Sequence, residues 1–90
     1  MNDLEFTILM PCLNEEKTVA ACVEKAAGWL KRSGYTGEVL IVDNGSTDAS
    51  AENARAAGAR VVSEQRRGYG SALIRGIREA RGKYIIMGDC

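Results

Sequence analysis

The 90-residue sequence contains no histidine and only three cysteines, Cys12, Cys22 and Cys90. The absence of histidine excludes a histidine-based catalytic triad and a Cys/His zinc site, because both require an imidazole. The odd number of widely spaced cysteines argues against a disulfide framework and indicates reduced thiols. Because reduced thiols are typical of the cytoplasm, we expect a cytoplasmic location.

The sequence also lacks an excess of charge and a long apolar run. Twelve Lys and Arg residues balance twelve Asp and Glu residues, so the formal net charge is zero. This balance argues against a general nucleic-acid-binding protein, which normally carries a basic excess. Every apolar run is far shorter than the roughly 18 residues needed to span a membrane. With 46% apolar residues, the composition indicates a folded globular domain.

Four short apolar runs alternate with three helical patterns. The runs lie at 6–10, 39–42, 60–62 and 84–87, and their length and Val/Ile content favour strands buried on both faces. Apolar residues spaced by three and four predict helices over about 14–33, 46–57 and 70–80. The order β-α-β-α-β-α-β predicts an α/β, three-layer Rossmann-like domain with a parallel sheet of strand order 3-2-1-4.

The helix ends and faces follow from local chemistry. Asn14 is predicted to cap the first helix, and Ser46 or Thr47 the second, because their side-chain oxygens can accept a hydrogen bond from a free N–H. In the third helix, the spacing of apolar residues predicts an inner face made of Leu73, Ile77 and Ala80.

Polar residues follow the ends of the predicted strands, at 11–15, 43–48, 64–70 and 88–90. In a doubly wound parallel sheet, ligands bind outside the carboxyl ends of the strands, where the strand order reverses. We therefore expect the carboxylates of Glu15, Asp43 and Asp89 to gather around one crevice.

Four segments carry a family resemblance: Met-Pro-Cys-Leu-Asn-Glu-Glu at 10–16, Val-Asp-Asn-Gly-Ser-Thr-Asp at 42–48, Gly-Tyr-Gly-Ser-Ala at 68–72 and Tyr-Ile-Ile-Met-Gly-Asp at 84–89. In this order they resemble the N-terminal half of family 2 glycosyltransferases, and more narrowly the dolichyl-phosphate or polyprenyl-phosphate mannose and glucose synthases. The resemblance implies that residues 1–90 are the nucleotide-sugar-binding part of a GT-A fold, truncated at the family's Asp-x-Asp motif.

The resemblance also implies site residues. The residue matching Asp43 contacts the nucleotide base. A carboxylate can accept a hydrogen bond from the ring N–H of uracil or guanine but meets ring acceptors on adenine and cytosine, which favours UDP- or GDP-sugars. Residues matching Pro11, Leu13 and Glu15 line the base and ribose side, and Ile41 contributes a packing contact. Many members have an aromatic residue where this chain has Leu13. Asp43 alternatively only starts a turn, and Glu15 alternatively only favours the first turn of a helix.

The metal and diphosphate side of the site involves Asp89 and Arg67. Asp89 corresponds to the first acid of the Asp-x-Asp motif, which holds Mg²⁺ or Mn²⁺ against the diphosphate. Cys90 is the middle residue, and the second acid would fall at position 91. Arg67 either reaches the diphosphate or remains a solvated loop residue. Gly68 and Gly70 do not form a dinucleotide fingerprint, because the third glycine would fall at Leu73.

The expected function is metal-dependent transfer of a sugar from a UDP- or GDP-sugar to an acceptor such as a polyprenyl phosphate. Some relatives carry C-terminal membrane helices, so the resemblance leaves two locations open for the parent, the cytoplasm and the cytoplasmic face of a membrane. Residues 1–90 are expected to be inactive alone. One alternative is a non-catalytic nucleotide-binding or self-associating module, since apolar surface at 84–87 is expected to stay open. A nucleotidyltransferase is a further alternative, but such enzymes usually carry a Gly/Arg/Lys-rich loop after the first strand.

Overall fold

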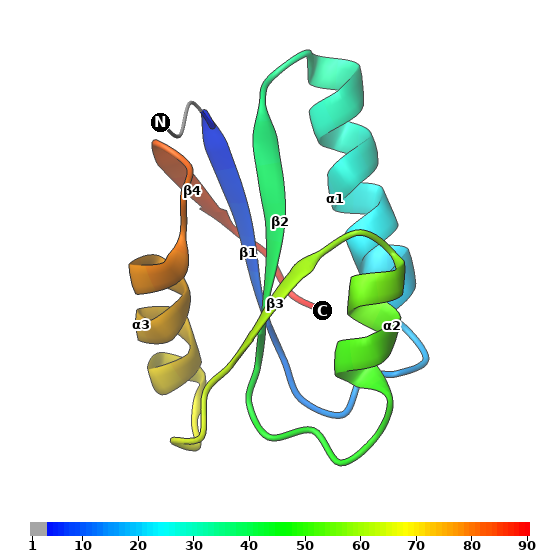
Figure 1. Cartoon of the computed structure of the whole chain (residues 1–90), viewed down its shortest axis with the longest axis vertical. Coiled ribbons are helices and arrows are strands. Elements are labelled where there is room, and N and C mark those ends of the chain that lie inside the picture. Colours follow the sequence, from blue (N-terminus) through cyan, green and yellow to red (C-terminus); the bar gives the residue numbers. More distant parts are fainter. Residues whose placement is uncertain (1–3) are drawn as a thin grey trace.

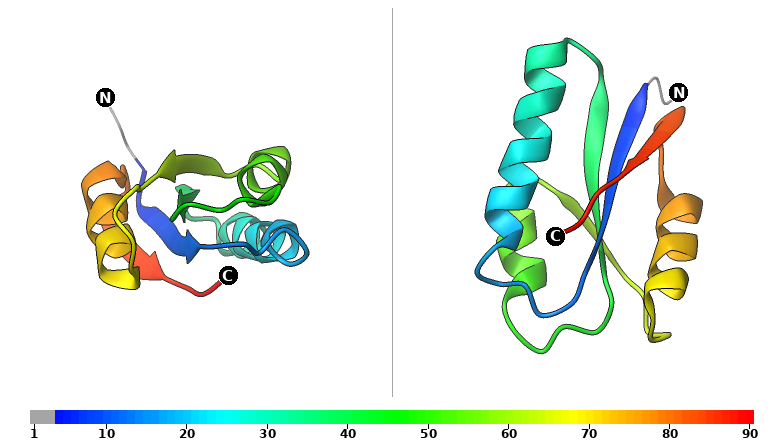
Figure 2. Two further views of the ribbon diagram at one scale, coloured as in Figure 1. Left: turned by 90° about the horizontal axis from the view of Figure 1, so that it is seen from below. Right: turned by 180° about the vertical axis from the view of Figure 1, so that it is seen from behind.

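The computed structural model describes residues 4–90 and contains seven elements in the predicted order (Figure 1). They are β1 (Phe6–Cys12), α1 (Val19–Ser33), β2 (Gly37–Asp43), α2 (Ser50–Ala56), β3 (Arg60–Ser63), α3 (Tyr69–Glu79) and β4 (Tyr84–Met87). The four strands form a parallel sheet of order β3-β2-β1-β4, as predicted. α1 and α2 cover one face of the sheet and α3 covers the other, which confirms the three-layer architecture (Figure 2).

The two central strands form the core. Alternate side chains of β1 and β2 point to opposite faces of the sheet, as the pleat of a strand requires. Ile8, Met10 and Ile41 pack on the side of α1 and α2, whereas Leu9 and Leu40 pack on the side of α3. Both strands are therefore buried on both faces, as their continuous apolar runs predict.

The edge strand β4 is less buried than the sequence predicts. It pairs with β1, and in the described part of the chain it has no partner strand on its other side. Tyr84, Ile86 and Met87 are exposed, and Ile85 packs partly beneath α3. The prediction of burial on both faces is wrong for β4, because none of the three described helices packs extensively on this strand. The expectation that apolar surface at 84–87 stays open is confirmed.

The inner face of α3 also differs from the prediction. Ala72 and Gly76 are buried against the sheet, whereas Ile77 is exposed. A Cβ atom placed on Gly76 would lie within van der Waals overlap of the Leu9 side chain, so the helix axis sits close to the sheet. Small residues therefore face the sheet. Of the three predicted inner residues, Leu73 and Ala80 pack partly against the same core cluster, and only Ile77 does not.

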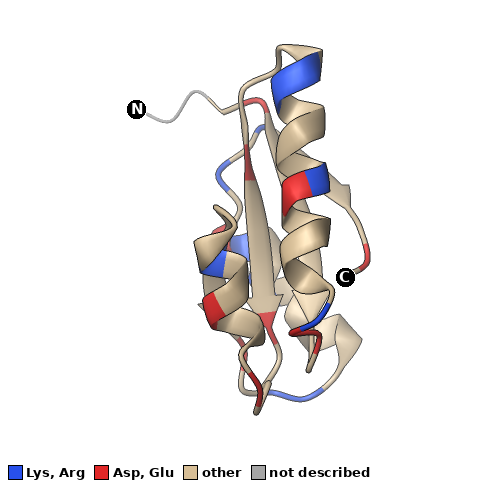
Figure 3. Cartoon of the chain, turned by 90° about the vertical axis from the view of Figure 1, so that its right-hand side faces the viewer, with Lys and Arg blue, Asp and Glu red and all other residues tan. Residues whose placement is uncertain are grey.

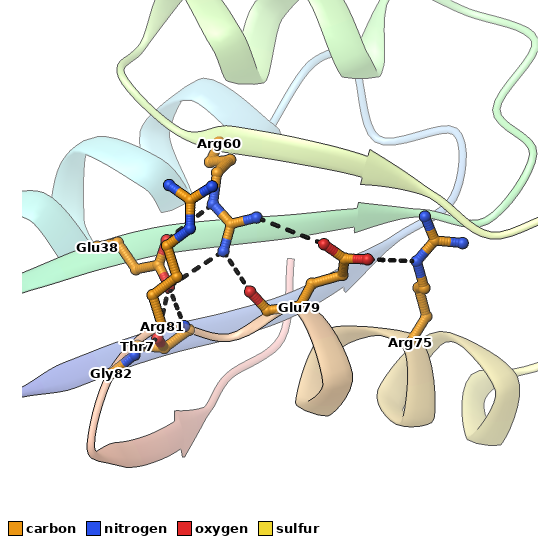
Figure 4. A network of polar contacts seen from close by, with 7 residues as sticks. All are labelled: Thr7, Glu38, Arg60, Arg75, Glu79, Arg81 and Gly82. Carbon is orange, nitrogen blue, oxygen red and sulfur yellow. Dashed lines mark hydrogen bonds and ion pairs between the residues drawn. The ribbon is translucent and has the colours of Figure 1, made fainter. Parts of the chain in front are cut away.

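A buried polar network ties the sheet to the connection between α3 and β4 (Figure 4). The carboxylate of Glu38 accepts hydrogen bonds from the Thr7 hydroxyl (2.7 Å), the Arg60 guanidinium (2.9 Å) and the Arg81 N–H (2.8 Å). The Thr7 hydroxyl oxygen accepts a further bond from the Gly82 N–H (2.8 Å). Burial raises the pKa of Glu38, but these donors outweigh it, so the pKa lies below its usual value of 4.5.

Replacing Glu38 by Gln should lower the free energy of unfolding at pH 7 by about 1–3 kcal/mol, because the charge-assisted bonds from Arg60 and Thr7 are weakened. A group with a lowered folded-state pKa contributes stability above its unfolded pKa, and this contribution disappears as the pH falls through the folded-state pKa. The difference between Glu38→Gln and wild type should therefore shrink below about pH 4.5.

Urea unfolding at pH 7, 5 and 3 measures this effect. Glu24→Gln, at an exposed position on α1, is the matched control and should stay close to wild type at each pH. A Glu38→Gln deficit of equal size at pH 7 and pH 3 would contradict the assignment.

Candidate functional site

Two loops at the carboxyl ends of β1 and β2 are joined by side-chain hydrogen bonds. Asn14 adopts a left-handed conformation (φ 53°), which asparagine tolerates better than most residues. Its N–H donates to the Ser46 hydroxyl (2.9 Å), and its side-chain oxygen accepts the Thr47 N–H (2.9 Å). The Glu15 N–H donates to the Ser50 hydroxyl (2.7 Å). These bonds hold the two loops side by side.

The predicted helix caps are therefore wrong. α1 begins at Val19, after Thr18, and α2 begins at Ser50, after Ala49, with no side-chain capping bond at either position. Asn14, Ser46 and Thr47 bind one another across the loops. Polar residues after a strand can satisfy a helix end or a neighbouring loop, and the local sequence does not distinguish the two.

Asp48 also has a structural role in this pair of loops. Its carboxylate accepts bonds from the Ser50 hydroxyl and N–H and from the Glu16 N–H (3.2 Å). The Ser50 hydroxyl is the main reason that the pKa of Asp48 lies below its usual value of 3.8.

Asn44 fixes the loop that precedes α3. Its amide group donates to the carbonyl oxygens of Glu64 (3.0 Å) and Arg66 (2.7 Å), and its side-chain oxygen accepts the Gly68 N–H (3.0 Å). These three bonds place Arg67 beside the carboxyl ends of β1 and β2. Sequence reasoning missed Asn44, although its position directly after a buried strand is typical of an asparagine that organises a turn.

A cleft of about 260 Å³ opens between these loops, at the carboxyl ends of β1 and β2. Four of the predicted site residues line it: Pro11, Leu13, Glu15 and Arg67. Six residues that were not predicted as site residues complete the lining: Cys12, Asn44, Gly68, Tyr69, Ala72 and Cys90. The predicted edge of the sheet is thus the place where the chain forms a cavity.

Asp43 adjoins this cleft but is not among the residues that line it. It is the last residue of β2, is 8% exposed, pairs in register with Cys12 and precedes Asn44, and both of these neighbours line the cleft. One carboxylate oxygen accepts the Ser46 N–H (3.3 Å), but the other, Oδ1, is buried and has no hydrogen-bond partner among residues 4–90. A buried acceptor without a donor costs free energy, so it is an unusual feature of a folded protein.

Two predicted site residues lie elsewhere. Ile41 is fully buried on the α1 side of the sheet and contributes to the core, which agrees with a packing role. Asp89 is exposed and lines a second groove of about 530 Å³, together with Lys25 and Arg32. The prediction that Glu15, Asp43 and Asp89 surround one crevice is therefore wrong.

The register of β4 explains the position of Asp89. β4 pairs with the first part of β1, and its last residue, Met87, lies opposite Leu9. β1 continues for three more residues to Cys12. The chain after β4 then turns toward α1 (Figure 2), so Asp89 lies beside the sheet while Cys90 reaches the cleft.

The described residues do not form a complete metal site. Within residues 4–90, no group of three or more Cys, Asp or Glu side chains gathers in a way that could hold an ion. Mg²⁺ and Mn²⁺ prefer several oxygen ligands, and Asp89 offers one carboxylate.

The three cysteines are free thiols that approach one another near the cleft. The sulfur atoms of Cys12 and Cys90 are 3.7 Å apart, and Cys22 packs against the same core cluster. Burial raises the pKa of Cys12 and of Cys90, so both are protonated thiols at neutral pH.

Charges of both signs surround the cleft. The loops that follow β1, β2 and β3 carry Glu15, Asp48, Glu64, Arg66 and Arg67. Figure 3 shows acidic and basic segments close together at this end of the molecule. The cleft can therefore present an arginine to an anionic group and a carboxylate to a hydrogen-bond donor.

None of the helices in residues 4–90 has the length and apolar character required to cross a membrane.

Comparison with protein families assigns the chain to a known group. The family model described as glycosyl transferase family 2 matches residues 7–90, which include β2, β3 and β4 and all of β1 except Phe6. The low-salt glycan biosynthesis hexosyltransferase Agl6 of Haloferax volcanii is 40% identical over 83 residues, covering 92% of this chain and 20% of that protein. The dodecaprenyl-phosphate galacturonate synthase of Rhizobium johnstonii is 35% identical over 96 residues, covering 99% of this chain and 28% of that protein.

A solved structure shares the fold over nearly the whole chain. Glucosyl-3-phosphoglycerate synthase from Mycobacterium tuberculosis, in complex with Mn²⁺, UDP and phosphoglyceric acid, superposes with a TM-score of 0.83 at 31% identity. The match covers 96% of this chain and 32% of that structure. The chain thus spans about a third or less of the length of these relatives.

Proposed function

The chain belongs to glycosyltransferase family 2, and from this premise we propose that its cleft binds the nucleotide of a UDP-sugar donor. We propose that residues 1–90 are the donor-binding part of a longer enzyme that transfers the sugar to an acceptor. The carboxylate of Asp43, which adjoins the cleft-lining residues Cys12 and Asn44 and has one oxygen without a hydrogen-bond partner among residues 4–90, supports this proposal best. Uracil carries a ring N–H that can donate to a carboxylate.

The residues that line the cleft can contact different parts of the nucleotide. Leu13 and Pro11 give apolar contacts to a planar ring, and Arg67 lies where a guanidinium can bind a diphosphate. Guanine also offers an N–H to a carboxylate, so GDP is the second candidate, whereas adenine and cytosine present ring acceptors there. The UDP bound in the solved relative favours uracil.

The parent is proposed to use Mg²⁺ or Mn²⁺, with Asp89 as one ligand and further ligands from outside the described residues. Such an ion neutralises charge on the departing diphosphate. The Mn²⁺ and Mg²⁺ complexes of the relatives support this assignment. Because one carboxylate is a poor metal site, residues 1–90 are proposed to bind the donor without transferring its sugar.

The acceptor is proposed to be a polyprenyl phosphate. This proposal is supported by the relative named dodecaprenyl-phosphate galacturonate synthase. The relatives named glucosyl-3-phosphoglycerate synthase support a small phosphorylated acceptor as the second candidate.

We also propose a cytoplasmic location, which the three free thiols support.

A panel of nucleotides tests the donor proposal. The 90-residue chain is titrated with UDP, GDP, ADP and CDP, and binding is measured by calorimetry or NMR. UDP is expected to bind best, with GDP next, and ADP and CDP at least about tenfold weaker, because they place an acceptor against Asp43 Oδ1. Equal affinity for all four nucleotides would contradict base recognition by Asp43.

Self-association through β4 is a second proposal for the isolated chain. Three of the four β4 residues are exposed and apolar, and the free side of the strand presents unpaired backbone groups. A second copy offers an identical edge, so the two strands can pair. Replacing Ile86 by Lys should shift the chain toward monomer in sedimentation at high concentration, whereas the wild type should form dimers or larger species. A wild-type chain that remains monomeric would contradict this proposal.

A further inference from the structure

Two exposed apolar side chains approach the cleft from different sides of the sheet. Leu13 belongs to the loop between β1 and α1 and is 47% exposed, and Tyr69 is the first residue of α3 and is 58% exposed. Both line the cleft. Figure 1 shows that the loop after β1 runs toward α1, whereas α3 begins on the opposite face of the sheet. A planar ring that enters the cleft would therefore pass between an aliphatic and an aromatic side chain.

The remaining aromatic residues are engaged elsewhere. The chain has five aromatic residues, and four of them, Phe6, Trp29, Tyr35 and Tyr84, contact one another near the start of β1. Their ring centroids lie 4.9–6.0 Å apart. Tyr69 is the fifth aromatic residue, and it lies at the other end of the sheet on the wall of the cleft.

The backbone of Tyr69 is held firmly although its ring is exposed. The preceding residue, Gly68, has a positive φ of 117° and donates its N–H to Asn44 (3.0 Å). The Gly68 carbonyl accepts the N–H of Ala72, which is fully buried against the sheet. Because the backbone is fixed on both sides, only the two side-chain torsions of Tyr69 must be ordered when a ligand binds.

We propose that Tyr69 is a donor-binding residue on which the base of the nucleotide donor stacks, with Leu13 against the opposite face of the base. This inference rests on the proposed function, that the cleft binds a nucleoside diphosphate. Asp43 then recognises the edge of the base and Tyr69 its face. Since every base has an aromatic face, Tyr69 contributes affinity for all bases, and Asp43 selects among them.

UDP titrations of the 90-residue chain, followed by NMR, test the stacking. Tyr69→Ala should weaken UDP binding by about 5- to 100-fold, the range measured for loss of one base–aromatic stack. Tyr69→Phe should keep the affinity within about twofold, because the ring face remains. The uracil H5 and H6 signals should move upfield on binding to wild type and to Tyr69→Phe, and this shift should be absent in Tyr69→Ala.

Two controls make the outcome specific. Tyr35→Ala removes a similarly exposed tyrosine from the distant aromatic cluster and should bind UDP as the wild type does. Asp43→Asn tests the donor site itself. If Tyr69→Ala binds UDP as the wild type does while Asp43→Asn does not, the stacking proposal is overturned and the proposed function stands. If neither variant differs from the wild type, or the wild type does not bind UDP, both are overturned.

Discussion

Replacing Asp43 by Asn is expected to make the chain more stable while it removes most of its affinity for UDP. The Oδ1 atom is buried without a partner, so the free protein carries the cost of an unsolvated carboxylate oxygen. A neutral amide in the same position costs less to bury, and the free energy of unfolding should rise by about 1 kcal/mol. The amide can still accept the Ser46 N–H through its oxygen.

The loss of UDP affinity follows from the same substitution. If the amide oxygen binds Ser46, the amide N–H₂ group faces the N–H of uracil, and two donors meet. Loss of a hydrogen bond to a charged group costs about 1.5–3 kcal/mol, which corresponds to about 10- to 100-fold in affinity. UDP affinity and stability would thus change in opposite directions, as is common where a binding site carries an unsatisfied group.

Asp48→Asn is the matched control, because Asp48 lies in the same loop but is satisfied by Ser50 and Glu16. It should lower stability, the opposite sign to Asp43→Asn. Urea unfolding and UDP titration of the three proteins measure both effects. An Asp43→Asn chain that is less stable than wild type and binds UDP equally well would show that this carboxylate has a structural role only.

Replacing Gly82 by Ala is expected to be the most destabilising single-methyl change in the chain. A Cβ atom at this position would lie 2.4 Å from the carbonyl carbon of Phe6 and 2.4 Å from the backbone nitrogen of Thr7. Because these are backbone atoms of β1, the contact cannot be relieved by rotating a side chain. The Gly82 N–H also binds the Thr7 hydroxyl, so a shift of residue 82 disturbs the Glu38 network as well.

The expected loss for Gly82→Ala is about 3 kcal/mol, the upper part of the range for overpacked positions. Gly70→Ala is the matched control, because it also adds a single methyl group but into open space in the first turn of α3. It should be neutral or raise stability by up to about 1 kcal/mol, since alanine favours helix. Urea unfolding of both variants gives the comparison, and a Gly82→Ala chain as stable as Gly70→Ala would contradict the close approach.

The position of the candidate cleft and four of its ten lining residues could be predicted from the sequence. Pro11 lies near the end of β1, Leu13 and Glu15 follow β1, and Arg67 follows β3; they line one cavity because parallel strands end at the same edge. Asn44 and Tyr69 could not be assigned in the same way. Their roles depend on bonds between segments about twenty or more residues apart, such as that from Gly68 to Asn44, and a local pattern does not contain them.

The face of a helix and the direction of a side chain required the tertiary structure. The apolar spacing in α3 predicts Ile77 on the inner face, but the close approach to Leu9 leaves room only for Ala72 and Gly76. Likewise, Asp89 follows a strand as predicted. However, β4 ends opposite Leu9, three residues before the end of β1, and Asp89 therefore lines a different groove.

The sequence by itself determined the layers, the strand order and the edge of the sheet at which ligands bind. The layers and the ligand edge follow from the alternation of apolar runs and helices and from the right-handed connection between parallel strands. Only the tertiary structure decided which atoms meet at that edge. Strand register decides it for Asp89, because β4 ends opposite Leu9, three residues before the end of β1, and Asp89 then lines a different groove. Side-chain placement decides it for Asp43, whose buried Oδ1 atom has no hydrogen-bond partner among residues 4–90.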